Sequence, residues 1–238
     1  MGRTGMASEV RIREAGPRVT IFRHGEPPRS QSEAAYLLIR DRILSLALPP
    51  GSLVHEAQLR EELSIGRTPI REALQRLAHE KLVRSVPNRG TFITDVNITD
   101  LARITEVRVV LEGHAARLAA ERGTAADRAA LGELLTGLGS VELTDQRELM
   151  KLDHEIHRSI YRCARNSFLE STLERYFNLS LRLWFLVLDQ GVRLREAVTE
   201  HRTLLEAILA GDGDGAEQAM RHHVSGFESE IRKILVER

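Results

Sequence analysis

Residues 152–157 read LDHEIH and bring one aspartate and two histidines close together on a predicted helix. Asp153 and His157 are four residues apart and share a helix face, and a carboxylate with an imidazole suits a divalent metal ion. The stretch nearly matches the H-E-x-x-H signature of zinc proteases, but Arg158 takes the place of the second histidine. The alternative ligand pair is His154 with His157; otherwise His154 is expected to face solvent or to support the ligands.

Two further histidines lie on apolar helix faces. His201 precedes Leu204 by three residues, and His223 follows Met220 by three and precedes Phe227 by four. Buried ionisable groups must be paired or must bind a metal, so we predict a site for a divalent ion, with zinc as the first choice and Ni, Mn or Fe as alternatives. The predicted ligands are Asp153, His157, His201 and His223.

Three kinds of protein could use such a site. A ligand sensor would hold a small molecule at the metal, a hydrolase or lyase would need a general base beside it, and a structural ion would only stabilise the fold. Glu155 is two residues from both Asp153 and His157 and therefore points to the far side of the helix, and no other base is evident. We therefore favour a sensor without catalytic residues over an enzyme.

The elements that must position these ligands are helices. From residue 98 onward the chain shows only helical periodicity, which predicts an all-α antiparallel bundle over 98–238. Gly211–Gly215 resembles a calcium loop, but the full pattern is absent and a joint between helices is preferred. The expected helices span about 99–121, 125–138, 144–165, 167–189, 192–210 and 213–236.

The first part of the chain has a different pattern. Residues 1–30 lack periodicity and are predicted to form a flexible tail. Helices are expected from about 32 to 46, 56 to 63 and 68 to 80, followed by β-like runs at 82–86 and 91–94 around a turn at 87–90. Three helices and a two-stranded ribbon predict a winged helix-turn-helix over 31–97, so the whole chain is mainly α.

A winged helix-turn-helix predicts binding to double-stranded DNA. The second helix of the motif enters the major groove, where arginine pairs with guanine and threonine bonds a base or a phosphate. The alternative is a solvated, charged helix face. The predicted DNA-binding residues are Arg67, Thr68, Arg71 and Gln75 on that helix, and Arg89 and Gly90 at the tip of the wing.

Charge and composition agree with this division. Residues 1–97 carry 15 Lys+Arg and 11 Asp+Glu, a difference of +4, and residues 98–238 carry 19 and 23, a difference of −4. No apolar run is long enough to span a membrane and no signal peptide is evident, so we expect a cytoplasmic, nucleoid-associated protein without a membrane partner. The single cysteine, Cys163, suits a reducing compartment.

The run from Pro49 to Thr94 resembles the DNA-binding domain of the GntR family of bacterial transcription regulators. Gly66 departs from the usual Ser or Thr, and Ala57 stands where some members carry a base-contacting arginine. The resemblance rests on Pro50-Gly51, Leu59, Leu63, Arg67-Thr68-Pro69, Arg71-Glu72-Ala73-Leu74, Leu77, Arg89-Gly90 and Phe92.

The second part of the chain contains Asp100-Leu101, Glu106-Val107-Arg108, Leu111-Glu112-Gly113, Ala115-Ala116-Arg117-Leu118-Ala119, Asp153 with His157, Glu200-His201-Arg202, and Ala219-Met220-Arg221 with His223. On these residues, 98–238 resemble the FCD ligand-binding domain of the FadR-type branch of that family. The resemblance implies a ligand-responsive regulator, in most cases a repressor, that binds a pseudo-palindromic operator as a homodimer and a small carboxylate effector beside the metal. It also implies the same four metal ligands. Arg108 is the candidate partner of the effector carboxylate, unless it pairs with a nearby glutamate. Arg182 and Trp184 are expected to line the effector pocket, with core packing as the alternative for Trp184.

Overall fold

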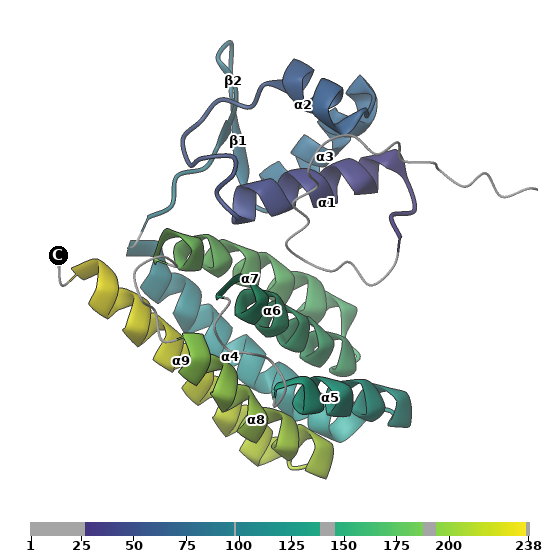
Figure 1. Ribbon diagram of the computed structural model, residues 1–238, viewed down its shortest axis with the longest axis vertical. Helices are drawn as coiled ribbons and strands as arrows, with labels where there is room; N and C mark the ends of the chain where they lie inside the picture. The colour runs from purple at the N-terminus through teal and green to yellow at the C-terminus, as the bar shows by residue number, and fades with distance from the viewer. Residues whose placement is uncertain (1–26, 98, 139–145, 188–193, 237–238) are drawn as a thin grey trace, which may run out of the picture.

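The computed structural model describes residues 27–97, 99–138, 146–187 and 194–236 (Figure 1). The predicted tail, 1–30, falls almost wholly outside the described residues, as do the outer ends of three predicted helices at 144–145, 188–189 and 192–193. Within the described residues, no helix is both long and apolar enough to cross a membrane.

The first part of the chain forms a winged helix-turn-helix, which confirms the predicted fold. Ser30 caps the first helix by accepting a hydrogen bond from the Glu33 amide, and the Ile70–Leu77 stripe of the third helix is buried. The elements are α1 (Gln31–Leu44), α2 (Glu56–Leu63), α3 (Arg67–His79), β1 (Val83–Val86) and β2 (Gly90–Ile93).

The wing differs slightly from the sequence prediction. Gly90 was placed in the turn, but it pairs with Val86 as the first residue of β2. Its φ of +103° is unfavourable for any residue with a side chain, and a Cβ there would approach Leu53 Cδ1 to 3.0 Å. The strands are antiparallel, with Val83 opposite Ile93.

The second part is helical throughout its described residues. Its core is built from apolar faces that all the helices contribute, and α4 lies centrally, in contact with α6, α7, α8 and α9. Three helices begin and end at the predicted residues: α2 in the first part, and α5 and α9 in the second. The helices are α4 (Thr99–Arg122), α5 (Ala125–Leu138), α6 (Gln146–Cys163), α7 (Ser167–Val187), α8 (Leu194–Ala210) and α9 (Gly213–Val236).

The winged domain sits on one end of the bundle. Helix α1 packs against α7, and α4 is the first element that follows β2 in the chain (Figure 1). Gly211 and Asp212 form the joint between α8 and α9, and Gly213–Gly215 belong to the first turn of α9, where the Gly215 amide donates to the Asp212 carboxylate at 2.9 Å. This is the role of a helix cap, which agrees with the preferred interpretation of that stretch.

Candidate metal centre and DNA-binding surface

The four predicted metal ligands meet inside the bundle. Asp153 and His157 project from α6, His201 from α8 and His223 from α9, and all four side chains are buried. One potential ligand atom from each residue lies within 4.8 Å of the others. The apolar helix faces that the sequence indicated therefore do converge.

The distances between these atoms fit a shared ion. The Nε2 atom of His157 lies 3.2 Å from Nε2 of His223 and 3.3 Å from Nε2 of His201. Asp153 Oδ1 lies 3.6–3.9 Å from the three nitrogens. Ligand bonds of about 2.1 Å at angles between 90° and tetrahedral separate neighbouring ligand atoms by roughly 3.0–3.4 Å. The two distances from His157 match this spacing, and the carboxylate stands slightly further away.

Two glutamates that were not among the predicted site residues orient two of the imidazoles. Glu112 Oε2 lies 2.7 Å from His157 Nδ1, and Glu200 Oε2 lies 3.0 Å from His223 Nδ1. An ionised carboxylate only accepts hydrogen bonds, so each Nδ1 donates, and the Nε2 of a neutral ring then carries a lone pair toward the centre. Such carboxylate–histidine pairs commonly support metal ligands.

This donor set fits a divalent cation. Lone pairs of two imidazoles and of the Asp153 carboxylate face one another in a buried space, which is unfavourable unless positive charge lies between them. Three imidazoles with one carboxylate suit Zn, Ni, Mn or Fe better than Ca or Mg, which prefer oxygen ligands. The residues present therefore fit the metal that the fold family implies.

Glu112 also links the histidines to Arg108. Arg108 Nε donates to Glu112 Oε1, and its Nη1 donates to Ser180 Oγ at 2.8 Å. Burial opposes ionisation of Glu112, but Arg108 and His157 outweigh it and lower the pKa of Glu112 to about 2. Arg108 was predicted to meet an effector carboxylate. In this structure it has the alternative partner, a glutamate, although the pair is buried and not on the surface.

Aromatic rings close the centre on the side of α7. The Phe177 ring packs 4.8 Å from the ring of His157 and 5.6 Å from that of His154. His154 is therefore buried, and the expectation that it faces solvent was wrong, because α7 covers this side of α6. Tyr161, one turn after His157, is fully buried, and burial raises the pKa of its hydroxyl well above the usual value.

Trp184 and Arg182 lie in different surroundings, although both come from α7. Trp184 packs against Phe227 with ring centroids 4.6 Å apart, and the Arg108 guanidinium lies 5.6 Å from the same Phe227 ring. Arg182, five residues and roughly 140° around the helix from Phe177, instead hydrogen-bonds Thr94 in the winged domain. Its predicted place in an effector pocket gains no support from this position.

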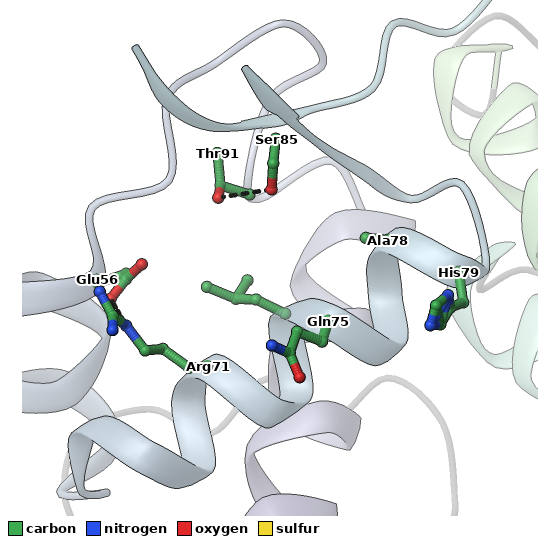
Figure 2. Close-up of a pocket in the computed structure, with 8 residues that line it drawn as sticks. Glu56, Arg71, Gln75, Ala78, His79, Ser85 and Thr91 are labelled. Atoms are coloured by element: carbon green, nitrogen blue, oxygen red, sulfur yellow. Dashed lines mark hydrogen bonds and ion pairs between the residues drawn. The ribbon is translucent and has the colours of Figure 1, made fainter. Parts of the chain in front are cut away.

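The residues predicted to read DNA line one exposed face of α3. Arg67, Thr68, Arg71 and Gln75 are all exposed, while the opposite face of the helix is buried. A pocket of about 490 Å³ lies between α3 and the wing. Figure 2 shows Arg71 and Gln75 on its α3 side, with Ser85 and Thr91 on the strands opposite. Arg71 Nε donates to Glu56 Oε2 at 3.2 Å. Such a concave surface, with the polar side chains of Arg71, Gln75 and Thr91 along it, suits a duplex backbone.

The remaining two predicted contacts lie at the tip of the wing. Arg89 is exposed in the turn between the strands, and its amide donates to the Val86 carbonyl at 3.0 Å. Gly90 follows it at the start of β2. The tip of the wing thus presents an exposed cation, which suits a phosphate or the minor groove of a duplex.

Both parts of the chain match known protein families. Residues 31–93 match the family described as "Bacterial regulatory proteins, gntR family", and residues 103–226 match the FCD domain. Among solved structures, the chain is similar to E. coli McbR/YncC, with a TM-score of 0.76 and 24% identity over 86% of this chain and 98% of that one. At this identity the likeness concerns the fold.

Curated relatives carry names that agree. An uncharacterized HTH-type transcriptional regulator of Streptomyces ambofaciens is 31% identical over 210 residues, 87% of each chain. A probable D-xylose utilization operon transcriptional repressor of Paenarthrobacter nicotinovorans is 30% identical over 182 residues, 76% of this chain and 79% of that protein. These relatives are transcription regulators and not enzymes, which agrees with the absence of a catalytic base in the sequence prediction. The chain thus belongs to the GntR family of bacterial transcription regulators and carries an FCD domain.

Proposed function

We propose that this chain is a metal-dependent, organic-acid-responsive repressor. Its FCD domain holds a divalent ion, zinc by preference, through Asp153, His157, His201 and His223. The observation that carries the proposal is the convergence of three Nε2 atoms and one carboxylate oxygen in a buried space, with Glu112 and Glu200 fixing two of the rings. The Paenarthrobacter relative carries the name of a probable transcriptional repressor.

The effector in this proposal is a small carboxylate that the bound ion would help to hold. Arg108 is linked to the metal ligands by its ion pair with Glu112, and its guanidinium lies over the rings of Phe177 and Phe227. Trp184 packs against Phe227. A second carboxylate arriving there would compete with Glu112 for the guanidinium. Effector binding would alter operator affinity only if it favours one arrangement of the domains over another.

We propose the domain boundaries, the DNA contacts and the homodimer as the sequence predicts them. Residues 31–97 form the winged domain and 98–238 the FadR-type effector and dimerisation domain, preceded by a tail at 1–30. Arg67, Thr68, Arg71 and Gln75, with Arg89 and Gly90 from the wing, contact a pseudo-palindromic operator. A homodimer in the cytoplasm, associated with the nucleoid, would match the two-fold symmetry of such a site.

The metal is tested first by elemental analysis. The protein purified without added chelator should contain about one equivalent of a transition metal per chain, and His201→Ala should lose it. His222→Ala is the matched control, because His222 neighbours His223 in α9 but is exposed. Equal metal content in all three proteins would contradict the assignment of the ligands.

The effector is tested by thermal unfolding with small hydroxy-, keto- and dicarboxylic acids, on metal-loaded and on chelator-treated protein. A ligand of the native state raises the melting temperature, with about 2.7 kcal/mol gained at 100 times its Kd. We expect a stabilising acid that acts only on metal-loaded protein. Stabilisation by metal without any active acid would instead favour the structural ion.

A further inference from the structure

Arg182 joins the bundle to the base of the wing. It is 2% exposed; its Nη1 donates to Thr94 Oγ1 at 2.8 Å and its Nη2 donates to the Thr94 carbonyl. The Thr94 hydroxyl in turn lies 2.8 Å from the carbonyl of Lys81, in the turn that precedes β1. One side chain of α7 therefore holds the residue after β2, and through it the chain before β1.

This arrangement is costly for stability. Both acceptors of Arg182 are uncharged, and its Nε has no hydrogen-bond partner among the residues that the structure describes. Burial lowers the pKa of Arg182 to about 10, although Asp95 acts in the opposite direction. A buried cation with only neutral acceptors stabilises a fold less than an apolar side chain of similar volume. We therefore attribute to Arg182 a role in connecting α7 with the wing, and not a role in stabilising the fold.

The same helix contacts the candidate effector site. Ser180, two residues before Arg182, accepts the hydrogen bond from Arg108, and Phe177 packs on the ring of His157. Helix α7 also packs against α1 of the winged domain (Figure 1). A displacement of α7 at Ser180 would thus reach Thr94 within one turn of helix.

We propose that Arg182 is a positioning residue for DNA binding, which fixes the wing to α7 so that the wing follows this helix. The inference deepens the proposed function, on which it rests for the origin of any displacement. The attachment of the wing to α7 does not depend on the metal or on the acid.

The test measures the distance between wing and helix by double electron–electron resonance in the full chain. Spin labels are placed at Pro87→Cys in the wing turn and at Phe168→Cys, which is 84% exposed at the start of α7, with Cys163→Ala as background. The variants are Arg182→Gln and Thr94→Val. Arg175→Gln is the matched control in α7, because within the described residues Arg175 forms no hydrogen bond with the winged domain.

We expect one narrow distance distribution in the parent and in Arg175→Gln, and a broader or displaced one in Arg182→Gln with circular dichroism unchanged. If the distance distribution changes only in Arg182→Gln, the hydrogen bond to the Thr94 carbonyl is sufficient for the attachment. If it changes in both variants, the hydrogen bond to the Thr94 hydroxyl also contributes. If Arg182→Gln does not fold, Arg182→Met decides, because it removes both hydrogen bonds to Thr94 and keeps an apolar side chain in the buried position. Distributions like that of the parent in each folded variant would overturn the inference. If elemental analysis finds no metal in the parent protein, the proposed function is contradicted, but the distance measurement still tests the attachment of the wing to α7.

Discussion

Glu112 is the residue whose removal the structure makes most informative. It is fully buried and forms an ion pair with Arg108 on one side and a hydrogen bond with His157 on the other. Glu112→Gln keeps the shape and removes the charge, which leaves Arg108 without a counter-ion in the core. Breaking a buried pair in this way costs about 3–5 kcal/mol.

The expected loss can be measured as a change in unfolding. For a domain of this size, 1 kcal/mol corresponds to about 2–4 °C, so Glu112→Gln should melt about 6–20 °C lower in the presence of a chelator. Its metal affinity should fall by about 10–100-fold, because His157 loses the carboxylate that fixes its tautomer. Differential scanning calorimetry and a competitive metal titration provide the two values.

Two further variants distinguish the buried pair from a general loss of charge. Glu228→Gln removes the half-buried partner of the exposed Arg232 at the same i, i+4 spacing and should cost no more than about 0.5 kcal/mol. Arg108→Met combined with Glu112→Leu removes both buried charges and should restore most of the stability, but not the metal affinity. A loss below about 1 kcal/mol in Glu112→Gln, with unchanged metal affinity, would refute the role given to this residue.

Three other predictions concern separate parts of the chain. Cys163 is 3% exposed and burial raises its pKa to about 11, so iodoacetamide at neutral pH should modify it in urea but hardly in the native protein, as read by mass spectrometry. Asp127 forms a capping box with Thr124, and, although burial opposes it, these hydrogen bonds and Arg165 lower its pKa. Asp127→Asn should therefore cost about 0.5–2 kcal/mol at neutral pH, and the difference from the parent in urea titrations should disappear as the pH falls through the lowered pKa; an equal difference at pH 2 would refute this. Arg71→Ala should weaken binding to a duplex selected by the protein from a randomised pool by about 1–3 kcal/mol and relax one base preference, whereas unchanged selection would exclude Arg71 from base contact.

The sequence predicted those parts of the structure that depend on periodicity. The stripes of α6, α8 and α9 place Asp153, His201 and His223 on apolar faces, and helices with apolar faces can only pack together. The winged domain followed from three short helices and a Gly-containing hairpin. Exposure of Arg71 and its neighbours on α3 follows from the same pattern.

The partners of each side chain could not be predicted in this way. Glu112 is polar and four residues from Arg108, which is also the pattern of an exposed ion pair, and only the packing of α4 against α6 brings it to His157. Glu112 stood among the residues of the family resemblance, and this was the signal that could have identified it. Arg182 faces the winged domain because of how two domains dock, a contact for which the periodicity of α7 contains no information.

The central claim is that an organic acid acts on DNA binding through the metal centre. The most direct measurement is fluorescence anisotropy of the selected duplex, titrated with metal-loaded protein and with His201→Ala, each with and without the acid found by thermal unfolding. We expect the acid to change the affinity of the metal-loaded protein for the duplex by about 5–150-fold and to leave the affinity of His201→Ala unchanged. An equal effect of the acid on both proteins would contradict it.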